Sequence, residues 1–172
     1  DTISPIVACI DTTIYLSSSG SVTIDSSFLY DYSVISCRTQ TISLAKSTFS
    51  CADLGTNTVG LILTETGGAS DTCYANVTVI DTIHPSAFCK DTTLYLDAIG
   101  IVGIDSSFLN NGSLDNCQIS TIALSKDSFN CSNLGVNSVQ VIVSDASGNK
   151  DTATVTITVE GDQTQNTVPV AT

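Results

Sequence analysis

The sequence predicts an all-β protein made of two tandem β-sandwich domains. Three observations support this fold class. The chain repeats itself after 80 residues, its apolar segments are short and rich in β-branched residues, and clusters of Gly, Ser and Asn separate those segments. Asp, Ser and Thr are abundant, and no amphipathic run is long enough for a helix of ordinary length, so strands and turns are favoured.

The repeat defines the domain organisation. The segment "DTISPIVACIDTTIYL" at residue 1 returns as "DTIHPSAFCKDTTLYL" at residue 81, and "FSCADLGTNTV" at 49–59 returns as "FNCSNLGVNSV" at 129–139. We therefore assign one domain to residues 1–80, a second to 81–160, and a polar tail or linker to the next module to 161–172. With "VIDTIHP" as a short hinge, two such domains joined end to end are expected to form a rod.

Each repeat supplies five candidate strands in the same order. They are short, and they either alternate apolar and polar residues or run apolar with β-branched residues. In the first repeat they are residues 12–16, 21–24, 37–44, 58–64 and 73–80, and in the second 92–96, 101–104, 119–125, 138–144 and 152–159. The turn signals "SSSG", "TGGA", "NNGS" and "SGNK" separate strands, and only "DSSFL" is expected to form a turn of helix. The four recurring phenylalanines, Phe28, Phe49, Phe108 and Phe129, are predicted to pack in the cores.

Charge and composition exclude several classes of protein. The net charge is −12, with 17 acidic residues against 5 basic ones, which is the opposite of what phosphate binding requires, so no nucleic-acid partner is expected. No run of 18 apolar residues is present, so no membrane span is expected in this chain. Seven cysteines are typical of an exported protein, and they predict an extracellular or cell-surface location.

Catalysis is not expected. The only histidine, His84, is followed by proline in the predicted linker, and Ser4 replaces it in the first repeat. A histidine that acts as a catalytic base needs a third group to hold it, and a linker position does not provide one. The carboxylates lie in Ser- and Thr-rich turn sequence, where Asp closes turns.

The order of these motifs resembles a known family. The pattern "D-x-x-x-P…C…YLD…G…IDSSFL…NGS-DNC…LSK-FxC…LG-NxVxVxVSDxSGN…TVTV" is similar to hyaline-repeat (HYR-like), immunoglobulin-like modules. It resembles most closely the tandem repeats of very large surface adhesins and extracellular fibre proteins of gliding and predatory bacteria. The match covers nearly all of residues 1–160.

The resemblance implies a function. A chain of this kind is a structural repeat module of a large secreted or cell-surface bacterial protein, a stalk or filament unit in adhesion or cell–cell attachment. Its partners would be neighbouring repeats of the same long chain, with self-association into fibres. The alternative is an adhesin module that binds a cell-surface glycan or another surface, with calcium as a stiffening ion.

The cysteines predict a disulfide framework. Four cysteines allow three connectivities, and we favour Cys37–Cys51, Cys117–Cys131 and Cys9–Cys73. The family resemblance supports a tie between first and last strands, and strand parity also places Cys9 and Cys73 at the same end of the domain. Ala153 stands where the second repeat would need its fourth cysteine, which leaves Cys89 unpaired. Cys89 is then either a buried free thiol or a bridge to another chain or module; with a different pairing scheme, the odd thiol moves to Cys117 or Cys131.

Three further sets of residues are candidate sites. Oxygen donors alternate in "SDASGNKD", which suggests a calcium site, although a simple hairpin turn explains the same segment. The candidate metal ligands are Asp81, Asp145, Asn149 and Asp151.

The Asp-Thr pairs fit an O-glycosylation pattern used by some of these bacteria, although Asp turns beside Thr-rich strands explain them as well. The candidate acceptors are Thr2, Thr12, Thr82, Thr92 and Thr152. The loop "LYDYSVIS" is apolar where the second repeat is polar, so we predict a contact patch there. Its residues are Tyr30, Tyr32, Val34 and Ile35.

Overall fold

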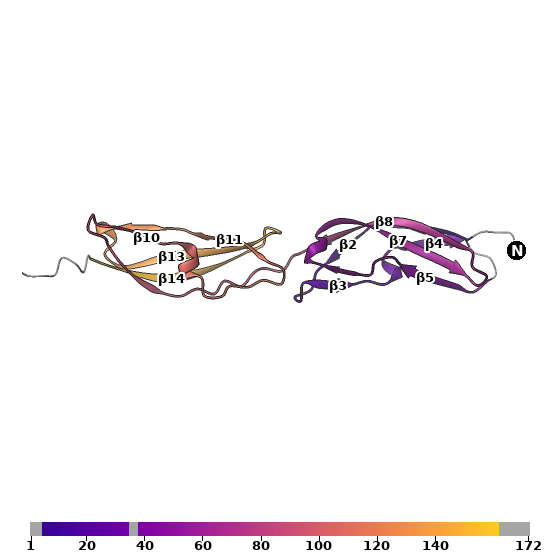
Figure 1. The fold of residues 1–172 in the computed structure, drawn as a ribbon, viewed down its shortest axis with the longest axis horizontal. Helices are drawn as coiled ribbons and strands as arrows, with labels where there is room; N and C mark the ends of the chain where they lie inside the picture. Colours follow the sequence, from indigo (N-terminus) through magenta and orange to yellow (C-terminus); the bar gives the residue numbers. More distant parts are fainter. Residues whose placement is uncertain (1–4, 35–37, 162–172) are drawn as a thin grey trace, which may run out of the picture. The chain divides into compact units, whose positions relative to one another are not determined.

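The computed structural model describes residues 5–34 and 38–161 and divides the chain into two units, Asp1–Ile83 and His84–Thr172 (Figure 1). The predicted boundary after residue 80 lies three residues before this division. Among the described residues, each unit consists of strands with two short helical turns. Each unit is described by itself below.

The first unit contains eight strands and two 3-10 turns among its described residues. The strands are β1 (Ile6–Cys9), β2 (Thr12–Tyr15), β3 (Ser21–Thr23), β4 (Tyr30–Val34), β5 (Gln40–Leu44), β6 (Thr48–Ser50), β7 (Gly55–Glu65) and β8 (Ser70–Ile80). The turns are η1 (Ser26–Phe28) and η2 (Cys51–Asp53). Strands β2, β8, β7 and β5 form a four-stranded sheet in that order, while β1 pairs with β4 and β3 pairs with β6.

The second unit repeats this plan with fewer strands. They are β9 (Thr92–Tyr95), β10 (Ile101–Gly103), β11 (Ile119–Leu124), β12 (Ser128–Asn130), β13 (Gly135–Asp145) and β14 (Lys150–Glu160), with the helical turns α1 (Ser106–Leu109) and η3 (Cys131–Asn133). Strands β11, β13, β14 and β9 form the four-stranded sheet, and β10 pairs with β12. Isolated bridges, Ser86 to Leu114 and Cys89 to Asn110, stand where the first unit has the β1–β4 ladder.

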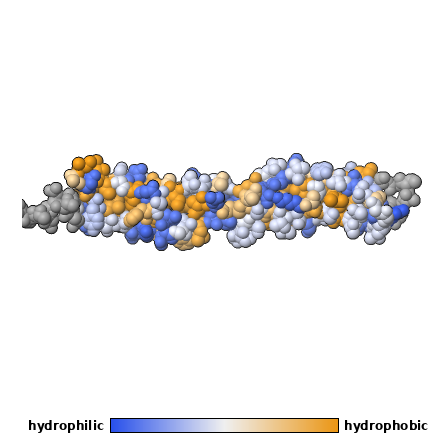
Figure 2. Space-filling view, in the orientation of Figure 1, coloured by the Kyte–Doolittle hydropathy of each residue, from blue (hydrophilic) through white to orange (hydrophobic). Residues whose placement is uncertain are grey.

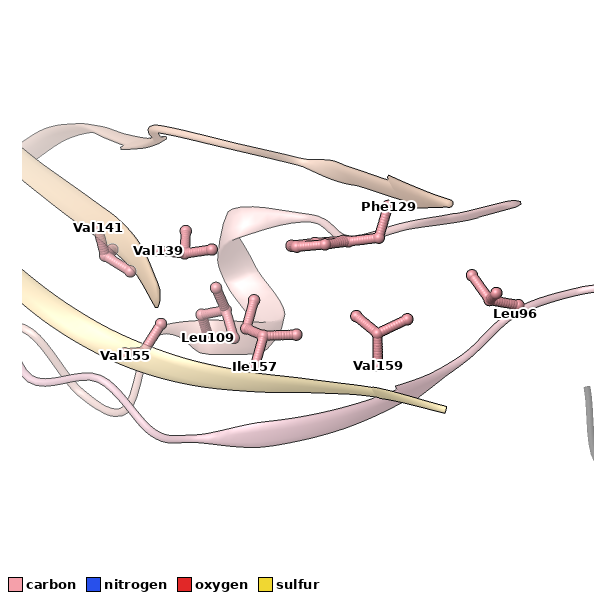
Figure 3. Close-up of a cluster of buried hydrophobic side chains, with 8 residues drawn as sticks. All are labelled: Leu96, Leu109, Phe129, Val139, Val141, Val155, Ile157 and Val159. Carbon is pink, nitrogen blue, oxygen red and sulfur yellow. The ribbon is translucent and has the colours of Figure 1, made fainter. Parts of the chain in front are cut away.

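The long central hairpins set the position of each core. Along β8 and β14, alternate residues are buried in the second half of the strand, because successive side chains point to opposite faces of a sheet. In the second unit, Phe129 from β12 and Leu109 from α1 lie against the buried face of β13 and β14 (Figure 3). The buried cluster is Leu96, Leu109, Phe129, Val139, Val141, Val155, Ile157 and Val159. Both units are therefore immunoglobulin-like β-sandwiches.

The core prediction is right for two of the four phenylalanines and wrong for the other two. Phe49 and Phe129 are buried, while Phe28 and Phe108 are exposed. Phe28 and Phe108 lie in the predicted helical turns, which Asp25 and its counterpart in the second repeat cap. In those turns the following leucine points inward instead, and it is fully buried in both units.

Candidate functional sites

A disulfide joins the first strand of the first unit to the last. Cys9 in β1 and Cys73 in β8 are bonded, with their Cα atoms 5.7 Å apart and a sequence separation of 64. This is the tie that the family resemblance and strand parity predicted. It closes most of the unit into one covalent loop, so an unfolded chain that keeps the bond has less conformational freedom.

The second unit lacks this bond, and Cys89 is a half-buried free thiol, as predicted. Ala153, at the position of Cys73, pairs with Val141 in the β13–β14 ladder. Burial raises the pKa of the Cys89 thiol, a hydrogen bond with Ser113 lowers it, and the charge of Asp151 raises it further. The thiol therefore stays protonated and weakly reactive at neutral pH.

The predicted Cys117–Cys131 pairing is wrong. Cys131 is an exposed free thiol, whereas Cys117 is disulfide-bonded. Cys131 lies four residues before Gly135, the first residue of β13, while Cys117 follows Asp115, whose carboxylate lies within 4.8 Å of that of Asp145, the last residue of β13. That strand has 11 residues, so the two cysteines lie roughly 30 Å apart, far beyond the reach of a disulfide. In the first unit Cys51 is disulfide-bonded, and Cys37 lies outside the described residues.

The acidic turn between β13 and β14 is closed by its own side chains. The backbone N–H of Asn149 donates to Asp145 Oδ1 at 2.8 Å, and its side-chain amide donates to Asp145 Oδ2 at 2.7 Å. Gly148 has a φ of 91°, which the turn requires and which glycine adopts without strain. These contacts fit the hairpin-turn interpretation of the segment.

Asp115 is a candidate cation ligand that the sequence prediction missed. One of its carboxylate oxygens lies within 4.8 Å of one from Asp145, and its Oδ1 is buried with no hydrogen-bond partner among the described residues. Asp151 does not join them, because its carboxylate accepts the N–H groups of Ala87 and Thr152. Asp81 belongs to the first unit, where it accepts the N–H of Ile83. The calcium site therefore stays a prediction.

The Asp-Thr pairs hold backbone groups of neighbouring segments. Asp71 accepts the N–H of Val7 at 2.8 Å, and its counterpart Asp151 accepts that of Ala87 at 2.9 Å. Asp11 accepts the N–H of Asn76, and Asp91 that of Thr156, each at 2.7 Å. The hydrogen bonds from Asn76 lower the pKa of Asp11, and those from Ala87 and then Thr152 lower that of Asp151. The recurrence of these aspartates thus has a structural explanation.

The predicted glycosylation sites differ in accessibility. Thr82 and Thr152 are exposed, Thr12 and Thr92 are half-buried at the starts of β2 and β9, and Thr2 lies outside the described residues. Glycosylation at these positions stays a prediction, which the intact mass of the protein from its native source would test.

The predicted contact patch lies on the β1–β4 ladder. Tyr32 and Val34 are exposed and pair with Ala8 and Ile6, and Ile6 is exposed as well. Tyr30 is half-buried, and its hydroxyl hydrogen-bonds to the Ser33 hydroxyl at 2.8 Å. Ile35 lies outside the described residues. The apolar part of this surface therefore consists of Ile6, Tyr32 and Val34.

The His84 imidazole contacts the backbone at the start of β14. Its Nδ1 lies 2.9 Å from the carbonyl oxygen of Lys150, at the start of β14. In the part of the chain that the structure describes, no helix is long and apolar enough to cross a membrane.

Comparisons with known proteins give structural likenesses only. No family model and no curated protein matches the chain. It is similar to a crystal structure of human mucin-like protocadherin EC1-2, with 13% identity, a TM-score of 0.46, and coverage of 91% of this chain and 98% of that one. Sidekick-1 immunoglobulin domains 1-4 give 10% identity, a TM-score of 0.47, and coverage of 91% and 49%. Drosophila N-cadherin EC1-4 gives 14%, 0.44, and coverage of 92% and 50%.

Proposed function

We propose that this chain is a non-enzymatic structural repeat module of a large secreted or cell-surface bacterial protein. It acts as a stalk or filament unit in adhesion or cell–cell attachment. The neighbours of the module are further repeats of the same long chain. The proposal rests on the duplication, the all-β composition and the disulfide chemistry of an oxidising compartment.

Parallel strand pairing supports the mechanical role of the module. In the first unit β2 pairs in parallel with β8, and in the second β9 pairs in parallel with β14. An early strand and the last strand of each unit are therefore neighbours that point the same way. When the two ends of a unit are pulled apart, these strands slide in opposite directions along their axes. All hydrogen bonds of the ladder are then loaded together, rather than one after another.

Single-molecule pulling tests this mechanical role. The chain is held in reductant so that only the strand ladders resist. Handles at residues 84 and 161 shear β9 against β14, whereas handles at 135 and 160 open the β13–β14 hairpin from one end. We expect a clearly higher rupture force in the first geometry. A rupture force no higher than that of hairpin opening would contradict the load-bearing role.

The exposed Ile6, Tyr32 and Val34 favour a second candidate, in which the module binds a glycan or a foreign surface. Electron microscopy of the native assembly separates the two functions. Regular lateral packing of modules supports the structural role. Isolated, unbundled rods that shift when a glycan is added would support the binding role instead.

A calcium ion that stiffens the second unit is a third candidate. Asp115 Oδ1 is buried and has no hydrogen-bond partner in the part of the chain that the structure describes, and with the neighbouring Asp145 carboxylate it offers hard oxygen ligands of the kind calcium prefers. The test is calorimetric melting with and without a chelator, with Asp115→Asn as the matched variant. A fall in melting temperature on chelation that the variant does not show supports the site. An unchanged melting temperature rules it out.

A further inference from the structure

The loop after α1 contains the only asparagine–glycine pair of the sequence, Asn111–Gly112. Figure 2 shows hydrophilic residues, drawn in blue, interspersed with apolar ones on the visible face of the second unit. Asn111 and Gly112 are both exposed, and Gly112 has a φ of 84°, in the left-handed region that favours glycine. Water therefore reaches both residues of the pair.

The two groups of this pair that can react with each other have no competing contacts. Neither the side-chain amide of Asn111 nor the backbone N–H of Gly112 makes a hydrogen bond with any residue that the structure describes. A Cβ added at Gly112 would meet nothing within 4 Å, and glycine itself has no Cβ to crowd its nitrogen. In contrast, the Asn149 side-chain amide donates to Asp145 Oδ2 at 2.7 Å and is followed by Lys150. The Gly112 nitrogen is thus unusually accessible to the preceding side chain.

The first repeat does not have this arrangement. Its equivalent residues are Asp31 and Tyr32, which lie inside β4, and Tyr32 pairs with Ala8 in β1. In the second repeat that ladder is interrupted at Asn111–Gly112, and isolated bridges remain on either side, at residues 110 and 114. The first unit is therefore an internal control for any chemistry at this pair.

We propose that Asn111–Gly112 is a covalent modification site at which the folded module converts asparagine to isoaspartate. The Gly112 nitrogen loses its proton to solvent and attacks Asn111 Cγ. The new C–N bond closes a five-membered cyclic imide, the Cγ–Nδ2 bond breaks, and the amide nitrogen takes up a proton and leaves as ammonia. The modification goes beyond the proposed mechanical role and does not depend on it.

Water then opens the cyclic imide at one of its two carbonyl groups. Opening at the main-chain carbonyl of Asn111 leaves the chain running through the former side chain, which is isoaspartate, and opening at Cγ leaves aspartate. Overall one water is consumed and one ammonia is released, and nothing is oxidised or reduced. Either product adds one negative charge, and isoaspartate also lengthens the backbone by one carbon.

The residues that follow the site hold the first segment of the second unit. The Ser113 hydroxyl accepts the backbone N–H of Phe88 at 2.9 Å, and the Leu114 carbonyl oxygen accepts that of Ser86 at 2.8 Å. An added backbone carbon before Ser113 displaces both acceptors from these positions. Isoaspartate therefore loosens the contacts of Ser86 and Phe88.

A neighbouring contact is fixed from the other side of the site. The backbone N–H of Lys90 donates to the carbonyl oxygen of Leu109 at 3.0 Å, and Leu109 precedes the modified bond. The added carbon does not lie between Leu109 and α1, so this hydrogen bond stays in place. Lys90 is thus a matched reporter for the local nature of the change.

Incubation of the purified chain at neutral pH tests the chemistry. We expect the peptide that contains Asn111 to gain about 1 Da and to separate into an isoaspartate and an aspartate form on peptide mapping. Asn111→Gln alters an exposed side chain without contacts, so it should melt at an unchanged temperature. It should also abolish the mass gain, since glutamine cannot close a five-membered ring. The peptide that contains Asn149 should stay unmodified over the same time.

Hydrogen exchange followed by NMR tests the structural consequence. In the isoaspartate form we expect exchange at the Ser86 and Phe88 amides to be faster by about tenfold or more, and exchange at Lys90 to be nearly unchanged. Freshly prepared Asn111→Asp carries the charge without the added carbon, so its exchange should match that of the unmodified chain.

Three results would overturn the inference. A chain in which Asn111 stays intact, or in which asparagines without a following glycine react as fast, would reject the modification site. Isoaspartate with unchanged exchange at Ser86 and Phe88 would reject the loosening of this segment. Equal acceleration in Asn111→Asp would reject the added carbon as its cause.

Discussion

Phe108 and Phe129 have the same side chain and opposite environments. Phe129 is 2% exposed inside the β12–β13–β14 core, and Phe108 is 51% exposed on α1, where the Lys90 ammonium lies 5.2 Å from its ring centre. Phe129→Ala removes a buried ring and leaves a cavity, so we expect a loss of about 3–5 kcal/mol in unfolding free energy. Phe108→Ala should cost about 1 kcal/mol or less. Urea denaturation of the chain measures both.

The first repeat supplies the control for this comparison. Phe49 is fully buried and Phe28 is exposed, so Phe49→Ala and Phe28→Ala should repeat the same contrast. Equal losses for the buried and exposed members of either pair would contradict the assigned core.

Ala153 offers a direct test of how the second unit lost its disulfide. In the first unit, Cys9 and Cys73 have a sequence separation of 64, and the same separation holds between Cys89 and residue 153. We expect Ala153→Cys to form a bond with Cys89 under oxidising conditions. By the loop-entropy estimate, this bond would stabilise the second unit by up to about 4 kcal/mol. Thermal melting with and without reductant measures the gain.

Ala153→Ser is the matched control, since it changes the side chain to a similar size without providing a sulfur. A variant in which Cys89 stays alkylatable after Ala153→Cys would show that the two positions are too far apart or misaligned in the second unit. That result would reject the view that one substitution separates the two repeats at this site.

At the scale of the elements, aspartate carboxylates connect neighbouring segments by accepting their backbone N–H groups. Asp151 holds the N–H of Ala87, and Asp91 holds that of Thr156 in β14. We expect Asp151→Ala to accelerate hydrogen exchange at the Ala87 amide while leaving Thr156 nearly unchanged, because each carboxylate protects a different amide. Asp91→Ala should do the reverse. Exchange followed by NMR checks both.

Uniform acceleration across the unit in either variant would instead indicate global destabilisation. In that case the two carboxylates would not be local contacts between segments, and the structural explanation of the Asp-Thr pairs would lose its support.

The strands of both four-stranded sheets could be predicted from the sequence, and so could β3 and β10, whereas β1, β4, β6 and β12 could not. In β8 and β14 the alternation "VTV" and "TVTITV" creates one apolar face, which is sufficient to predict a half-buried strand. Strands β1 and β6 have three or four residues, and their pairing depends on β4 and β3 in three dimensions. These two segments carry too little alternation of apolar and polar residues to be identified as strands alone.

The candidate sites show a similar limit. The Cys9–Cys73 bond could be predicted because the family resemblance and strand parity both place these two cysteines at the same end of the domain. The pairing of Cys117 with Cys131 failed because proximity in sequence says nothing about which end of an 11-residue strand each cysteine occupies. Asp115 was not among the predicted candidate ligands, because its approach to Asp145 depends on the folded loop.

For the whole molecule, acid should act through two opposing effects. The net charge of −12 creates repulsion that protonation relieves, and at low salt this favours the folded state as the pH falls. In the opposite sense, five aspartates have folded-state pKa values lowered from their ordinary 3.8, chiefly by hydrogen bonds. They are Asp11, Asp25, Asp53, Asp105 and Asp151.

We expect the second effect to control stability once salt screens the first. Near and below pH 3.8 the unfolded chain binds protons that the folded chain still excludes, so unfolding takes up protons and the free energy of unfolding rises with pH. The stabilisation is therefore present above pH 3.8 and is lost as the pH falls through the lower folded-state pKa values. Urea midpoints at pH 5.5 and 3.0, on either side of the pI of about 4.1, measure this loss in about 0.3 M salt, where the Debye length is below about 8 Å.

A double variant, Asp25→Asn with Asp105→Asn, should reduce the difference in urea midpoint between pH 5.5 and pH 3.0, because both carboxylates cap helical turns through Ser27 and Ser107. A midpoint that stays constant or rises between pH 5.5 and 3.0 would show that these hydrogen bonds contribute no net stability.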